Sequence, residues 1–179
     1  MFAEGGVDPR MTFDTFESLK GKTRALTKCV DWCTHFGQPL ASKPPVLFGP
    51  TGVGKTHLGN AVAHFMVTQR GLFSQVLPTV CIPRRDTDEV LRLADPDEVP
   101  VLVLDDLGAE KRTDRALECL YILIDGRLRA RAPTVVTTNF EPDALEQWLG
   151  DEYGPRIVGR LREMGEFVPV GGEDMRLRM

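Results

Sequence analysis

Residues 49–56 combine glycines, a lysine and a threonine in a spacing suited to holding phosphate. They fit the pattern G-x-x-x-x-G-K-[ST] at every fixed position. Glycines let the backbone curl so that successive N–H groups point at phosphate oxygens, and the following helix adds its positive end. Lys55 would reach the β- and γ-phosphates, and the Thr56 hydroxyl would hold Mg²⁺. The predicted nucleotide contacts are Gly49, Pro50, Thr51, Gly52, Val53, Gly54, Lys55, Thr56 and the adjoining His57. For His57 a simple helix-surface position is the competing interpretation.

A second chemical signal is the pair of carboxylates Asp105 and Asp106, which directly follows an apolar run. The carboxyl ends of parallel strands face the ligand crevice. Asp105 is therefore predicted to hold Mg²⁺ beside Thr56, and Asp106 to face a water that attacks the γ-phosphate. Asn139 follows a β-branched run in the same manner and would orient that water. An ordinary turn after a core strand is the alternative for both positions.

Apolar runs and helical stripes alternate along the chain, and these elements must position the polar residues. Residues 99–104 are nearly all Val and Leu, as expected for a strand buried on both faces. Expected strands cover residues 46–48, 76–82, 99–104, 134–138 and 166–170. Expected helices cover one or two segments within 13–36, then 55–69, 86–93, 114–128, 143–149 and 154–164. Alternation of this kind predicts an α/β fold with a mainly parallel sheet and helices on both faces.

Length and composition limit the remaining possibilities. The chain has 179 residues, 42% hydrophobic and 27% charged, which suits one globular domain and excludes wholesale disorder. No run approaches 18 apolar residues, so no membrane span is expected. Four cysteines are too few for a disulfide scaffold, and a reducing cytoplasm is the simplest compartment. Residues 1–12 are rich in Gly, Pro and charge, and we expect a flexible tail.

Charge also bears on partners. The net charge of −4 argues against nucleic-acid binding over the whole surface. Two arginine groups stand out nevertheless, and each is either a solvated face or a phosphate-binding cluster. Their members are Arg127, Arg129 and Arg131 in one group, and Arg156, Arg160, Arg162, Arg176 and Arg178 in the other.

Several stretches together resemble the AAA+ ATPase domain of bacterial replicative helicase loaders of the DnaC/DnaI type. The resemblance covers residues 13–178, and it places one AAA+ domain over residues 13–179. The most specific stretch is VLVLDDLGAEK at residues 101–111. The others are TFDTF at 12–16, residues 49–58, PTVVTTNF at 133–140, RIVGRLREM at 156–164 and GEDMRLR at 172–178.

The resemblance implies a P-loop NTPase with a five-stranded parallel sheet and a minimal C-terminal lid. It implies that Lys55 and Thr56 are the Walker A pair, that Asp105 is the Walker B metal ligand, and that Asp106 takes the place of a catalytic glutamate. Asn139 would be sensor 1 and Arg176 sensor 2. Arg160 matches the arginine finger best, with Arg156 second.

The partners implied are ATP/ADP with Mg²⁺, a replicative DNA helicase, single-stranded DNA, and further copies of the chain in a head-to-tail assembly when ATP is bound. Loaders of this type carry an additional N-terminal domain that grips the helicase, whereas we expect the residues before Gly49 to be the lead-in to the ATPase core. An isolated monomer would hydrolyse ATP slowly, because the arginine finger comes from a neighbour.

Three alternatives share the phosphate loop. The first is a transposition helper ATPase of the same AAA+ group. The second is a small P-loop kinase, which paired aspartates and late arginines fit less well. The third is a module that binds ATP without cleaving it, because aspartate at position 106 is shorter than glutamate.

Overall fold

A five-stranded parallel sheet forms the centre of the molecule. The computed structural model describes residues 2–20, 23–38 and 42–174. The strand order is β2-β3-β4-β1-β5, with every neighbouring pair parallel. The strands are β1 (Pro45–Phe48), β2 (Ser74–Pro78), β3 (Val101–Leu107), β4 (Thr134–Thr138) and β5 (Glu166–Pro169). The predicted α/β class with a five-stranded parallel sheet is therefore confirmed.

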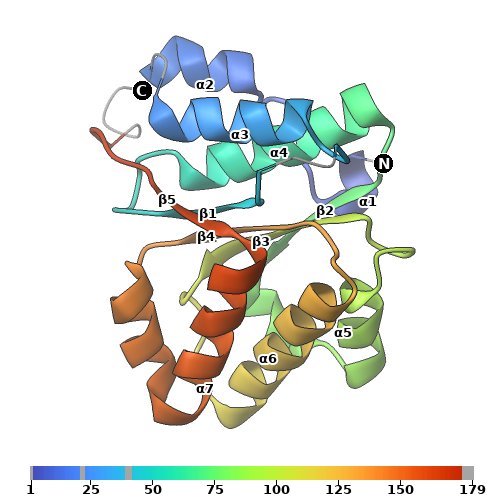
Figure 1. Ribbon diagram of the computed structural model, residues 1–179, viewed down its shortest axis with the longest axis vertical. Coiled ribbons are helices and arrows are strands. Elements are labelled where there is room, and N and C mark those ends of the chain that lie inside the picture. Colours follow the sequence, from blue (N-terminus) through green and yellow to red (C-terminus); the bar gives the residue numbers. More distant parts are fainter. Residues whose placement is uncertain (1, 21–22, 39–41, 175–179) are drawn as a thin grey trace.

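Helices cover both faces of the sheet, so the domain has three layers (Figure 1). One face carries α2 (Phe13–Lys20), α3 (Arg24–Thr34) and α4 (Lys55–Arg70). The other carries α5 (Thr87–Ala94), α6 (Asp114–Arg129) and α7 (Pro142–Met164). Side chains alternate along each strand, so Val46 joins the core under α5–α7 and Leu47 joins the core under α2–α4.

Local sequence signals explain several helix boundaries. Asp86 caps α5 in a capping box with Glu89, and Thr113 caps α6 by accepting a hydrogen bond from the Ala116 N–H. Gly71 ends α4 in the left-handed conformation. The helix α7 contains a break at Gly150, where φ is +85°, and this break separates the two helices expected at 143–149 and 154–164.

The structure differs from the expected flexible tail at the N-terminus. Residues Phe2–Gly5 form a short helix, α1, which lies beside β2 (Figure 1). Val7 is buried, and the Asp8 N–H donates to the Asn60 side chain on α4 at 3.1 Å. The sequence hides this packing among glycines and charged residues, because Val7 and Phe2 are the apolar side chains that reach the core there.

The second strand also lies elsewhere than predicted. The sequence suggested residues 76–82, whereas β2 ends at Pro78 and a 3₁₀ helix, η1 (Thr79–Arg84), follows. Pro78 lacks the N–H that a continuing ladder would need.

The C-terminal lid implied by the resemblance would follow β5. Residues 170–174 contain no helix, and the rest of that segment lies outside the described residues.

None of the helices within the described residues is long and apolar enough to cross a membrane.

Candidate nucleotide site

The phosphate loop joins the carboxyl end of β1 to the start of α4, as the sequence predicts. Gly54 adopts φ +99°, a conformation that L side chains rarely adopt. The loop forms one wall of a cavity of about 330 Å³. The cavity is lined by Met11, Thr51, Gly52, Gly54, Lys55, Thr56, Asp106 and Asn139.

The residues after β5 return to this loop. The Val170 N–H donates to the Phe48 carbonyl at 2.7 Å. A Cβ atom placed on Gly52 would overlap the carboxylate of Asp174. The C-terminal segment therefore packs directly against the phosphate loop, up to the last described residue.

Lys55 is buried at the centre of the site. Its Nζ donates to the carbonyls of Gly49 and Pro50, at 2.8 and 2.7 Å, and to Asn139 Oδ1 at 2.7 Å. Burial lowers the pKa of Lys55, and the carboxylates of Asp106 and Asp105 oppose that effect. Phosphate oxygens would replace these neutral acceptors with charged ones, so the ammonium group is suited to an anionic ligand.

Thr56, which lines the cavity, is in direct contact with Asp105. The Thr56 hydroxyl donates to Asp105 Oδ1 at 3.0 Å, and the Thr137 hydroxyl donates to the same oxygen at 2.7 Å. Burial raises the pKa of Asp105, and the neighbouring Asp106 adds to the rise, while the two threonine hydrogen bonds oppose it. A divalent cation would offset the unfavourable burial of this carboxylate.

A hydroxyl and a carboxylate in contact fit Mg²⁺, which prefers oxygen ligands and retains much of its water shell. Thr56 and Asp105 would hold the ion. No cluster of three or more His, Cys, Asp or Glu side chains is present in the described ranges, so any Mg²⁺ held here would rely on few protein ligands.

Asp106 and Asn139 form the next pair. Asn139 Nδ2 donates to Asp106 Oδ1 at 2.9 Å. Asp106 has φ +60°, and the pairing of β3 with β4 shifts register between Leu104 and Leu107. This irregularity turns the second carboxylate of the pair toward the cavity. Lys55, Asn139, Asp106, Asp105 and Thr56 are thus brought together at one edge of the sheet.

His57 lies beside Thr56 but contacts the N-terminal segment. Its Nε2 lies 3.0 Å from the Thr12 carbonyl and 3.0 Å from the Thr15 hydroxyl, and its ring meets Phe16 edge-on. Burial lowers the pKa of His57. His57 is not among the residues that line the cavity, and its nucleotide contact stays a prediction.

The two candidate arginine fingers, Arg160 and Arg156, are not among the residues that line the cavity. Arg160, on α7, donates from Nε to Asp125 at 2.5 Å and from Nη2 to the Tyr121 hydroxyl at 2.9 Å, and its guanidinium lies over the Tyr121 ring. Arg156 is exposed one turn earlier. Arg176, the predicted sensor 2, lies outside the described residues.

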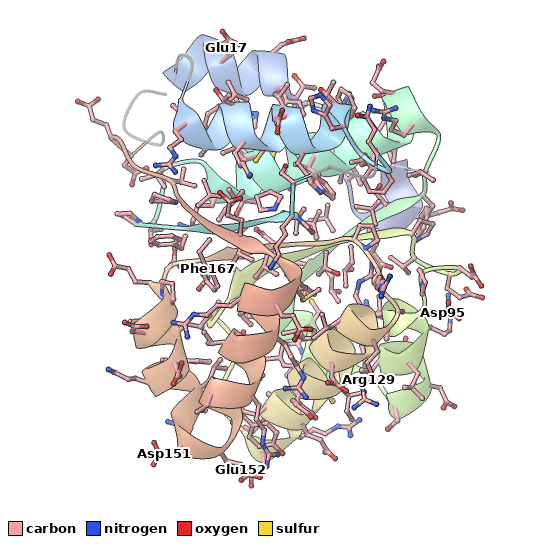
Figure 2. All side chains as sticks on the ribbon, in the orientation of Figure 1. Glu17, Asp95, Arg129, Asp151, Glu152 and Phe167 are labelled. Atoms are coloured by element: carbon pink, nitrogen blue, oxygen red, sulfur yellow. The ribbon has the colours of Figure 1, made fainter. Side chains whose placement is uncertain are left out.

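Sequence reasoning missed two residues at or near the site, Thr137 and Met11, and misjudged one arginine. Thr137 holds Asp105, and its place one pleat before Asn139 was a usable signal. Met11 reaches the cavity from the N-terminal segment, and no pattern in the sequence indicated that. Arg127 is neither a solvated nor a phosphate-binding residue, because it is fully buried at the opposite end of the sheet. Figure 2 shows Arg129, by contrast, at the outer surface of α6.

Together, the parallel sheet, the phosphate loop after β1 and the polar tips of β3 and β4 define a P-loop ATPase of the AAA+ class. The family model described as "IstB-like ATP binding protein" matches residues 41–179. The chain belongs to this family.

Individual relatives agree with this assignment. Over 126 residues the chain is 30% identical to a putative ATP-binding protein in an insertion sequence of Mycobacterium tuberculosis. The aligned region covers 68% of this chain and 49% of that protein. Over 174 residues it is 24% identical to the replicative helicase loader DnaC of Escherichia coli strain K12, covering 90% of this chain and 68% of the loader. The chain thus spans about half the length of the first relative.

Structural similarity points the same way. The crystal structure of DnaI superposes with a TM-score of 0.77 at 23% identity, covering 94% of this chain and 92% of that one. The predicted resemblance to the AAA+ domain of DnaC- and DnaI-type proteins is confirmed.

Proposed function

We propose that this chain hydrolyses ATP with Mg²⁺ and uses the cycle as a helicase-loader switch in the initiation of DNA replication, in the cytoplasm. One observation carries the proposal. Two hydrogen-bonded groups of side chains lie at the carboxyl edge of a parallel sheet beside a phosphate loop: Lys55 with Asn139 and Asp106, and Thr56 with Asp105. The chemical type and the position of each side chain suit one part of phosphoryl transfer to water.

The residues divide the chemistry between them. Lys55 would leave the loop carbonyls and neutralise charge on the γ-phosphate. Thr56 and Asp105 would hold Mg²⁺, which supplies further neutralisation when bound. Asp106 would accept a proton from the attacking water, and Asn139, already bonded to Asp106, would fix the direction of that water. The loop N–H groups and the start of α4 would cradle the remaining phosphate oxygens.

The arginines supply the link to assembly. We propose that Arg160 is the arginine finger, and that Arg156 is the second candidate. In a head-to-tail assembly this arginine would contact the nucleotide bound to a neighbouring copy. Within one chain Arg160 is held by Asp125 and Tyr121, so it would exchange these partners on assembly. An isolated monomer would then turn over slowly, because such fingers contribute about 10³–10⁵ in rate. Single-stranded DNA and a replicative helicase are the proposed partners, and Arg176 is the proposed sensor 2.

Mixing two inactive variants tests this arrangement. Asp106→Asn removes the proposed base but keeps Arg160, whereas Arg160→Ala keeps the base but donates no finger. Each variant alone should bind ATP and turn over poorly. Mixed at equal concentration they should recover activity, because the Asp106→Asn chain supplies its arginine to the intact site of its neighbour. Activity of Arg160→Ala alone at the wild-type level contradicts the finger role, and the same experiment with Arg156→Ala tests the second candidate.

A second candidate function is that of a transposition helper ATPase. The match to the IstB-like family and the relative from an insertion sequence favour it. The proposed ATP hydrolysis is the same for both functions, and only the DNA and protein partners differ. Filaments on duplex DNA with ATP would favour the helper role, whereas preference for single-stranded DNA and capture of a replicative helicase would favour the loader.

A further inference from the structure

A buried glutamate lies just behind the proposed catalytic turn. Glu110 is only 4% exposed, although carboxylates are rarely buried. Its Oε2 accepts hydrogen bonds from the Thr79 hydroxyl at 2.6 Å and from the Gly108 N–H at 3.0 Å. Its Oε1 is buried without a hydrogen-bond partner among the described residues. Burying such a group costs free energy, so its position calls for an explanation.

The contacts of Glu110 converge on Asp106. The single proton of the Thr79 hydroxyl is shared between Glu110 and the Asp106 carbonyl, which lies 2.9 Å away, and the Ala109 N–H donates to the same carbonyl at 3.0 Å. Residues 106–110 therefore form a tight turn, which Glu110 closes through Gly108 and ties to η1 through Thr79. Thr79 is itself 1% exposed, so water does not compete for these bonds.

The turn determines where the Asp106 carboxylate points. Asp106 has φ +60°, a conformation that is unfavourable for a residue with a Cβ and persists only when surrounding contacts enforce it. In this conformation the carboxylate reaches Asn139 at 2.9 Å and lines the cavity. Relaxation to a negative φ would swing it away from both.

We propose that Glu110 is a positioning residue for Asp106, acting through Thr79 and Gly108 to hold the left-handed turn that aims the carboxylate at the attacking water. Glu110 does not line the cavity, so it acts only through other residues. The inference rests on the proposed role of Asp106 in ATP hydrolysis.

Two pairs of variants test it. Glu110→Ala removes the acceptor, and Glu110→Gln keeps an oxygen in its place. Thr79→Val removes the bridging hydroxyl at nearly constant shape, and Thr79→Ser restores it. Thr134→Val is the control for loss of a fully buried hydroxyl away from the site. That hydroxyl accepts from Arg127 Nε at 2.6 Å and donates to the Ala132 carbonyl at 3.0 Å, at the amino end of β4. For each variant, kcat, the Kd for ATP and the Tm are measured.

Glu110→Ala and Thr79→Val should lower kcat on the order of 10- to 100-fold, as expected when a catalytic group is misplaced, and leave the Kd for ATP within about twofold. Glu110→Gln and Thr79→Ser should restore most of kcat. Thr134→Val should lower the Tm without lowering kcat. If Glu110→Ala does not fold, the kcat of Thr79→Val tests the positioning role in its place.

Three results would overturn the inference: an unchanged kcat in Thr79→Val, a parallel loss of kcat and ATP affinity, or an equal loss of kcat in Thr134→Val. Asp106→Asn separates this inference from the proposed function. If Asp106→Asn keeps full turnover, the role of Asp106 itself is wrong. If it loses turnover while Thr79→Val does not, only the positioning role fails.

Discussion

At the scale of single residues, the ionised Asp105 carboxylate lowers the stability of the ligand-free protein, and a bound cation would offset this effect. Burial, with help from Asp106, raises its pKa above that of the unfolded chain. The folded state therefore binds the proton more tightly, and the free energy of unfolding falls as pH rises through the window between the unfolded and folded pKa. Above that window the carboxylate remains destabilising unless a cation is bound.

We therefore predict that Asp105→Asn raises the Tm of the ligand-free protein at pH 7. The amide oxygen can still accept from Thr56 and Thr137, and the buried charge is gone. Each kcal/mol gained corresponds to roughly 2–4 °C in a domain of this size. The difference from wild type should shrink as pH is lowered through the window, because the wild-type carboxyl then takes up a proton. Thermal melts over a pH series measure this, and a lower Tm for the variant at pH 7 contradicts it.

Lys55 carries a second prediction at this scale. Lys55→Ala should abolish ATP turnover, because Lys55 is the one cationic side chain that lines the cavity within the described part of the chain. The variant should remain folded, since the lysine bonds only loop carbonyls and Asn139. Phosphate release and a thermal melt are measured together. Full activity in the folded variant would show that the phosphate loop is not the catalytic site.

At the scale of elements, Arg127 connects four segments at the end of the sheet opposite the site. It donates to the carbonyls of Leu93, Val99 and Pro133 and to the Thr134 hydroxyl. These partners are neutral, and burial lowers the pKa of Arg127 to about 10. The guanidinium thus joins α5, the approach to β3, α6 and the start of β4.

We predict that Arg127→Met lowers the free energy of unfolding by about 2–4 kcal/mol. Each buried carbonyl left without a donor costs ~1–3 kcal/mol, and removal of the buried charge offsets part of that. Arg129→Met is the control on the same helix, because its side chain is 76% exposed and should change stability by under ~0.5 kcal/mol (Figure 2). Chemical denaturation measures both. Equal effects would mean that Arg127 is not a structural connection.

The elements also show what sequence could and could not predict. The strand expected at 99–104 and the helices expected at 55–69 and 114–128 follow from a continuous apolar run and clear helical stripes. The observed β3, Val101–Leu107, begins two residues later and continues through the aspartate pair, which the apolar run could not indicate. The end of β2 was misplaced because apolar residues continue past Pro78, and only the missing N–H of proline stops the ladder. The burial of Arg127 could not be predicted, since it depends on the carbonyls of Leu93 and Val99, which lie about 30 residues earlier in the chain. The grouping of Lys55, Asp105, Asp106 and Asn139 was predictable, because parallel strands bring their carboxyl ends to one edge.

The N-terminal segment gives a prediction that involves several elements. Removal of residues 1–11 should lower the Tm, because it exposes the pocket of buried Val7 and leaves the Asn60 side chain without the Asp8 N–H. It also removes Met11 from the cavity, so the Kd for ATP should rise. A truncated chain with unchanged Tm and ATP affinity would restore the view of this segment as a flexible tail.

At the scale of the whole molecule, the proposed function depends on copies meeting head to tail. In the single chain Arg160 forms an ion pair with Asp125. Arg160 does not line the nucleotide cavity. With Arg160 as the proposed arginine finger, a complete catalytic site would need a second copy, and DNA that gathers copies would favour its formation.

The most direct test is free-phosphate release from ATP as a function of protein concentration, with and without single-stranded DNA. We predict that the rate per chain rises with concentration and rises again when DNA is added. A rate per chain that is constant in both would contradict the proposal, because it would show a nucleotide site that is complete within one chain and independent of DNA.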